Sequence, residues 1–200
     1  MLKSTRLPDR DYRTNGWYFV TICTRDRFCF FGDIVNGKIK LSKIGEIADK
    51  FWFEIPQHSK HTYIDTYVIM PDHIHGIIII DNPNLSSPCR DVACNVSTTK
   101  SGNVSTKYDH RTEKNEQYDF YQEMSKMSPK AGSLSSIVRS YKAAVTHWCK
   151  QNGYDNFAWQ PRFYEHIIRA DDSLNTTREY IVNNPLQWQN NQNNSANLWM

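Results

Sequence analysis

The chain has 200 residues with a net charge of +3, and its 39% hydrophobic content is enough to build the core of one domain. So small an excess of Lys and Arg excludes a uniformly basic protein, and any surface for a polyanion must therefore be local. Five cysteines without C-x-x-C spacing and a charged N-terminal stretch exclude a disulfide scaffold, a zinc ribbon and an exported protein, and predict a cytoplasmic one.

The first segments of the chain have strand, hairpin and helix patterns. Residues 17–24 are aromatic and β-branched, which predicts a strand, and residues 32–41 place an Asn-Gly turn between short apolar runs, which predicts a hairpin. Apolar residues then follow helical spacing as far as Ile55, with Ser42 as the expected N-cap and Pro56 beyond the end. This spacing predicts an amphipathic helix packed on a sheet.

Two more strands and a polar insertion come next. Residues 63–70 and 73–81 predict strands, and the second is so apolar that we expect it in the centre of the sheet. Residues 82–132 are rich in Ser, Thr, Asn and Lys and contain a near-repeat. Such a composition cannot offset its own ordering entropy, so we expect a disordered insertion within a single domain of residues 1–200.

The last part of the chain returns to regular patterns. Residues 133–152 carry an apolar stripe at helical spacing, residues 163–169 predict a strand, and a last helix is expected over about 173–183. Pro185 is expected to end that helix, and the Asn-rich residues 189–197 are expected to form a loose tail.

The order of these elements is strand, helix, strand, strand, helix, strand, with a trailing helix. This order predicts an α+β fold of the ferredoxin-like type, an antiparallel sheet with helices on one face. Because that fold supports many functions, the function must be argued from particular side chains.

The strongest local signal is the pair His73 and His75 in the apolar strand. Strand side chains alternate faces, so both imidazoles project to one side with their Cα atoms roughly 7 Å apart and can converge on one ion. The alternative is that they are ordinary polar residues at the start of a strand. The isoleucines that follow imply deep burial, where two neutral imidazoles need partners or a metal.

A second candidate group lies on the last predicted helix. Tyr180 and Asn184 are four residues apart, so they share a helix face and present a phenol beside an amide oxygen. Pro185 disfavours helical geometry at Asn184, which leaves Asn183 as an alternative ligand.

Several other side chains are candidates to contact DNA. Phosphate contacts are expected from four residues on or near the second long helix and the strand after it, each with a solvated surface position as the alternative: Arg139, Lys142, Arg162 and His166. Trp159 and Tyr164 are candidates to stack on bases, with a role in the core as the alternative.

Three separated motifs occur in one order along the chain, and together they resemble a known family. They are Pro71-Asp72-His73-Ile74-His75, the stretch from Trp159 to His166, and Tyr180-Ile181-Val182-Asn183-Asn184-Pro185. The chain resembles the single-tyrosine HUH transposases, and most of all the REP-associated tyrosine transposases, relatives of the insertion-sequence-200-like group. The resemblance extends from about Asp11 to Trp188, apart from the insertion.

The resemblance implies a ferredoxin-like nuclease whose C-terminal helix carries the nucleophile. By matching positions, His73, His75 and Asn184 become ligands of a divalent metal, and Tyr180 cuts and rejoins DNA through a 5′-phosphotyrosine. The mixed nitrogen and oxygen ligand set suits Mg²⁺ or Mn²⁺. The expected partner is single-stranded or hairpin DNA, a homodimer is left open, and no membrane partner is expected because no stretch approaches the roughly 20 apolar residues of a membrane span.

Three other functions were weighed. A histidine-triad nucleotide hydrolase needs a third alternating histidine, and position 77 is isoleucine. A metal-dependent phosphodiesterase that uses water as its nucleophile remains open, and it would not need Tyr180. A DNA- or RNA-binding ferredoxin-like module that has lost cleavage also remains open.

Overall fold

In a computed structural model of the protein, residues 14–83, 129–169 and 171–196 are described. The chain divides into two units, one of residues 1–85 and 130–200 and the other of residues 86–129. Almost all of the second unit lies outside the described residues, and so does most of the insertion predicted at 82–132. Every element described below belongs to the first unit.

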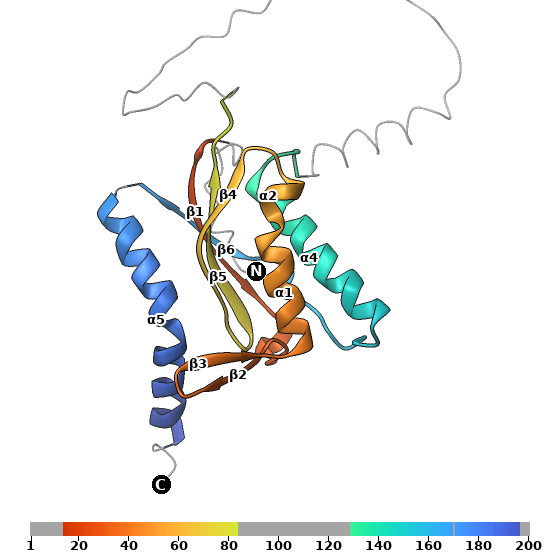
Figure 1. Ribbon diagram of the computed structural model, residues 1–200, viewed down its shortest axis with the longest axis vertical. Helices are drawn as coiled ribbons and strands as arrows, with labels where there is room; N and C mark the ends of the chain where they lie inside the picture. The colour runs from red at the N-terminus through yellow and green to blue at the C-terminus, as the bar shows by residue number, and fades with distance from the viewer. Residues whose placement is uncertain (1–13, 84–128, 170, 197–200) are drawn as a thin grey trace, which may run out of the picture. The chain divides into compact units, whose positions relative to one another are not determined.

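A four-stranded antiparallel sheet organises this unit, with its strands in the order β4-β5-β1-β6 (Figure 1). In chain order the strands are β1 (Gly16–Cys23), β4 (Thr62–Ile69), β5 (His73–Ile80) and β6 (Tyr164–Ile168). Helix α1 (Lys43–Phe53) follows the first of them, and α4 (Leu134–Gln151) precedes the last. This arrangement is the predicted α+β sheet, and β5 lies inside it as expected.

Local sequence explains where several elements begin and turn. The hairpin of β2 (Gly32–Val35) and β3 (Lys38–Leu41) turns at Asn36 and Gly37, whose φ angles are 53° and 70°. Ser42 caps α1 by accepting a hydrogen bond from the Gly45 amide, as the sequence predicts. Ser133 caps α4 in the same way, accepting from the Ser136 amide.

Two short elements were not expected. The 3-10 helix η1 (Arg25–Arg27) follows β1, and α2 (Ile55–His58) follows α1. Pro56 was placed beyond the end of a helix, but it occupies the first turn of α2, where its missing amide hydrogen leaves no bond unmade.

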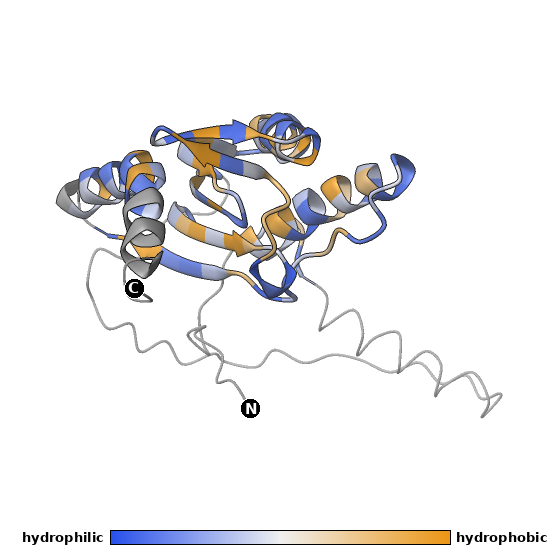
Figure 2. Ribbon diagram, turned by 90° about the horizontal axis from the view of Figure 1, so that it is seen from below, coloured by the Kyte–Doolittle hydropathy of each residue, from blue (hydrophilic) through white to orange (hydrophobic). Residues whose placement is uncertain are grey.

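One face of the sheet builds the main core together with α1 and α4. Alternate residues of β1 and β5 point toward these helices and are fully buried: Tyr18, Val20, Ile22, Ile74 and Ile78. Gly76 lies in the same row and leaves room for Trp52, because a Cβ at position 76 would lie only 2.4 Å from the Trp52 ring. Hydrophobic residues are concentrated in part of the sheet, whereas the helices and the remaining strands mix hydrophobic and hydrophilic residues (Figure 2).

Helix α5 (Asp171–Ala196) covers the opposite face of the sheet (Figure 1). Here the buried cluster is small: Ile77, Ile168 and Ile181 are buried, with partly buried neighbours around them. Arg178 on α5 also forms a 2.7 Å ion pair with Asp65 of β4.

The extent of α5 corrects two expectations. The helix was predicted to end near residue 183 before Pro185 and a loose tail, but it continues through Pro185 as far as Ala196. Proline removes one helical hydrogen bond, yet the side chains of Asn184 and Pro185 are both buried. Burial of this turn against the sheet offsets the lost bond. None of the described helices is both long and apolar enough to cross a membrane.

Candidate active site

His73 and His75 project from β5 toward α5 and face each other. Their Nε2 atoms lie 3.0 Å apart, and their side chains are nearly buried, at 4% and 6% exposure. Alternation along the strand puts both imidazoles on the face that α5 covers, away from the main core. The convergence predicted from the sequence is therefore present.

The second nitrogen of each imidazole has a fixed partner. Nδ1 of His73 lies 2.5 Å from Oδ1 of Asp72, and Asp72 forms a second, 2.7 Å contact with Nε of Arg27. Nδ1 of His75 lies 2.9 Å from Oγ1 of Thr21, its cross-strand neighbour on β1. An ionised carboxylate only accepts hydrogen bonds, so Nδ1 of His73 is the donor in the contact with Asp72, and its Nε2 is the atom that faces His75.

The pKa of His75 is lowered to about 3 by burial, with further contributions from His73 and Arg27. Desolvation disfavours the imidazolium, and positive charge on its neighbours adds to that effect. His75 is therefore neutral at physiological pH, which is the protonation state that a metal-binding imidazole requires.

Helix α5 brings the candidate nucleophile to this pair. The hydroxyl of Tyr180 lies 3.3 Å from Nε2 of His75, and 42% of the Tyr180 side chain is exposed. Two turns later, the Trp188 ring lies 5.7 Å from the His73 ring. Asn184 is four residues from each of them, so it lies on the same helix face, between the two contacts, and is 6% exposed. Asn183, the alternative ligand, is exposed.

The donor set is compatible with a divalent metal. Within the described residues no group of three or more His, Cys, Asp or Glu side chains could hold an ion, so a third protein ligand would have to be of another type, such as the Asn184 amide. Neighbouring ligands of an octahedral ion with bonds of about 2.1 Å lie about 3.0 Å apart, which matches the separation of the two Nε2 atoms. Asp72 supplies the carboxylate that commonly orients a metal-binding histidine.

The four predicted phosphate contacts are not all brought to this site. His166 is exposed on β6, opposite Phe19 of β1, and Arg162 is exposed just before that strand. The Lys142 ammonium donates hydrogen bonds to the carbonyls of Gln160 and Arg162, and burial lowers its pKa to about 8. Arg139 is exposed on α4, across the sheet from the histidines.

Five residues that contact the pair directly or through Asp72 were not predicted from the sequence. These are Phe19, Thr21, Arg27, Asp72 and Trp188. The carboxylate next to His73 was a usable signal, because a metal-binding histidine commonly donates its second N–H to a carboxylate. Thr21 becomes visible only from the register of β1 against β5.

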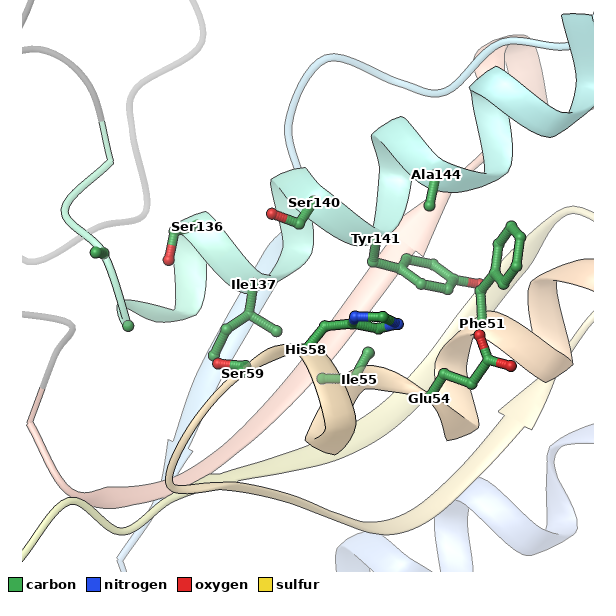
Figure 3. Close-up of a pocket in the computed structure, with 12 residues that line it drawn as sticks. Phe51, Glu54, Ile55, His58, Ser59, Ser136, Ile137, Ser140, Tyr141 and Ala144 are labelled. Carbon is green, nitrogen blue, oxygen red and sulfur yellow. The ribbon is translucent and has the colours of Figure 1, made fainter.

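A cavity of about 480 Å³ lies in the helix layer and not at the histidines. It opens between the α1–α2 segment and α4, with Phe51, Ile55 and Ile137 among its apolar lining (Figure 3). Glu54 and His58 supply polar groups from the α1–α2 side. Because α1 and α4 cover the other face of the sheet, the cavity is separate from the candidate active site.

The chain is similar in sequence to a known protein and in fold to solved structures. No family model matches the chain. A protein of Haemophilus influenzae, described as uncharacterized, is 34% identical over 190 residues, which cover 95% of this chain and 91% of that protein. The chain belongs to the family of this Haemophilus influenzae protein.

A solved structure has a fold similar to that of this chain. It is a REP-associated tyrosine transposase bound to a REP hairpin, with a TM-score of 0.54 and 20% identity. The match covers 93% of this chain and 74% of that protein. The transposase and this protein thus have the same fold.

Proposed function

We propose that the protein is a metal-dependent single-stranded DNA endonuclease and transposase that cuts and rejoins DNA through a 5′-phosphotyrosine at Tyr180. The observation that carries the proposal is the 3.3 Å contact between the Tyr180 hydroxyl and the imidazole of His75, itself 3.0 Å from His73. A phenol beside two imidazoles places a nucleophile next to residues that would hold a metal, which would polarise a phosphate there. The fold shared with a hairpin-bound tyrosine transposase supports the same function.

The chemistry is a strand transfer in which one ester replaces another. The Tyr180 oxygen attacks the scissile phosphorus, a bond forms between them, and the bond from phosphorus to the 3′ oxygen breaks. The leaving 3′ oxygen takes a proton and becomes a free hydroxyl. In the reverse step a 3′ hydroxyl displaces Tyr180, so strands are rejoined without a nucleotide cofactor.

The phenol proton goes to solvent in this scheme. His75 is the nearest nitrogen, but with a pKa of about 3 it is a weak proton acceptor at neutral pH. Tyr180 is 42% exposed, so water reaches its hydroxyl. His73, His75 and Asn184 would hold a divalent metal, which would polarise the phosphate and neutralise charge as it develops.

Labelled hairpin DNA tests the proposal. DNA labelled at its 5′ or its 3′ end is incubated with protein and Mn²⁺, denatured, and resolved on a gel that retains protein. We expect only the 3′-labelled fragment to migrate with protein, because its new 5′ end is attached to Tyr180. Tyr180→Phe should abolish the adduct and leave DNA binding nearly unchanged, since phosphate contacts dominate such interfaces.

Tyr63→Phe is the matched control, because Tyr63 is another half-exposed tyrosine of the same unit, at 54% exposure on β4. It should form the adduct as the wild type does. If Tyr180→Phe still cuts DNA, water is the nucleophile and the protein is a phosphodiesterase. If the wild type binds DNA with Mn²⁺ present but never cuts it, the protein is a binding module.

A further inference from the structure

Aromatic side chains form a continuous group beside the histidine pair, on the face of the sheet that α5 covers. The Phe19 ring stacks on the His75 ring at 5.4 Å and 23°, and meets the Tyr180 ring edge to face at 6.1 Å. On its other side Phe19 meets Tyr164 of β6 edge to face at 6.3 Å. Phe19 therefore joins the candidate nucleophile to a tyrosine on an edge strand.

Tyr164 is half exposed, at 49%, although it lies next to the site. Strand register sets its position: Tyr164 pairs with Thr21, and Thr21 pairs with His75. Adjacent strands are about 4.8 Å apart, so Tyr164 and His75 are separated by about 10 Å at their Cα atoms. One nucleotide spans that distance between its phosphate and the far edge of its base.

Arginines lie at the same end of the sheet. The turn after β1 carries Arg25 and Arg27, and hydrogen bonds from the Arg25 amide to Ala158 and from the Gln160 amide to Cys23 join it to the loop before β6. That loop carries Arg162, and all three arginines are exposed. The turn also carries the exposed Asp26, and Arg27 is paired with the buried Asp72, so Arg25 and Arg162 are the arginines left to meet a phosphate.

We propose that Tyr164, supported by Phe19, is a stacking platform for an unpaired base next to the phosphate that Tyr180 attacks. This inference rests on the proposed function and names the substrate feature that the site selects. A flat exposed ring beside a positive surface fits a nucleobase attached to a polyanionic backbone. A base still paired in a duplex is stacked on its neighbours, so it has no face to offer Tyr164, and the platform restricts the site to unpaired nucleotides.

Binding measured without cleavage tests the platform. The probe is a fluorescein-labelled thymidine oligonucleotide with a single 2-aminopurine, and EDTA is present so that no strand is cut. Stacking of one base on an aromatic ring corresponds to roughly a 5- to 150-fold change in affinity when the ring is removed. We expect that loss for Tyr164→Ala, together with reduced quenching of 2-aminopurine, while Tyr164→Phe retains both affinity and quenching.

Tyr63→Ala is the matched control. Tyr63 is exposed to a similar degree, at 54%, but lies on β4, the opposite edge strand, and pairs with Ile79 at the far end of β5 from His73. This variant should bind single-stranded DNA like the wild type. A duplex of the same length should bind more weakly and lose no affinity through Tyr164→Ala.

Each contrary result is distinct. Unchanged affinity and quenching in Tyr164→Ala, with a wild type that binds the oligonucleotide, would overturn the platform and leave the proposed function standing. An equal loss in Tyr164→Phe would assign the effect to the hydroxyl, and an equal loss in Tyr63→Ala would assign it to the fold, so both results reject stacking. A wild type that binds no single-stranded DNA would overturn the proposed function together with the platform.

Discussion

The two faces of the sheet are formed by the same strands but differ in the side chains that they carry. On the face covered by α1 and α4, the side chains of β1 and β5 are buried and mostly apolar, and the large residues Trp52 and Tyr141 pack over them. On the face covered by α5, the same strands contribute polar and aromatic side chains. The buried hydrophobic residues on this face are three isoleucines, Ile77, Ile168 and Ile181. Along β5, Ile74 lies between the two histidines and Gly76 follows His75, and both of these residues face α1 and α4.

This difference teaches how a stable fold accommodates an unfavourable site. Buried imidazoles and an exposed phenol contribute little to stability, so the stability has to come from elsewhere. Strand alternation lets the opposite face supply it without moving the backbone that holds the histidines. We therefore expect substitutions on the α1/α4 face to change the free energy of unfolding, and those on the α5 face to change binding and chemistry.

The largest expected effect is on the α1/α4 face. Trp52→Ala should lower the free energy of unfolding by about 3–5 kcal/mol, because Trp52 is fully buried between Gly76, Tyr67 and Tyr141. Urea unfolding followed by circular dichroism measures it. The next residue is the control: Phe53 is 69% exposed, so Phe53→Ala should remain within about 0.5 kcal/mol of the wild type. Equal losses in both variants would remove the contrast between the faces.

The next effect is on metal binding at the α5 face. His75→Ala should weaken Mn²⁺ binding at least ~100-fold, about 2.7 kcal/mol, because loss of a second-shell partner alone costs 10- to 100-fold in general. Isothermal titration calorimetry should find one site in the wild type. His147→Ala, at an exposed position on α4, should bind Mn²⁺ like the wild type. Unchanged Mn²⁺ affinity in His75→Ala would contradict the assignment of this ligand.

A smaller, graded effect follows from the pKa of His75. In the metal-free folded protein His75 stays neutral down to about pH 3, whereas in the unfolded chain it binds a proton below about pH 6.5. Between these values the unfolded state holds more protons, so stability present above pH 6.5 is lost as pH falls, by at most about 1.4 kcal/mol per pH unit.

The difference between wild type and His75→Gln isolates that contribution from other titrating groups. Urea unfolding of both proteins at several pH values in EDTA should give a wild-type curve that falls more steeply between pH 6.5 and 3. Parallel curves for wild type and His75→Gln would mean that His75 is protonated in the folded protein as readily as in the unfolded one.

Much of the fold could be predicted because its signals are local. The Asn-Gly turn at 36–37, the serine caps at 42 and 133, and the isoleucine run of β5 each act within a few residues. The predicted end of the last helix before Pro185 was wrong because that prediction also used only a local signal. The proline itself disfavours a helix, but the burial of Asn184 and Pro185 by the sheet is a tertiary term that no local pattern contains.

In the candidate site, too, the features that depend on local periodicity could be predicted, and those that depend on tertiary structure could not. The convergence of His73 and His75 follows from strand alternation, and the common face of Tyr180 and Asn184 follows from helix periodicity. That these two pairs meet depends on the docking of α5. The involvement of Thr21 depends on strand register, and the hydrogen bonds that the Lys142 ammonium donates to loop carbonyls depend on tertiary structure.

The glycine that follows the second histidine has a consequence for how relatives of this chain should vary. Position 76 is small because the Trp52 ring occupies the space in front of it, so the two positions share one volume. Homologous sequences with a larger residue after the second histidine should carry a smaller residue at position 52, and those with glycine should retain a large aromatic there. The residue after the histidine motif thus records the packing of a helix on the far side of the sheet, and its variation tracks that helix rather than the DNA chemistry.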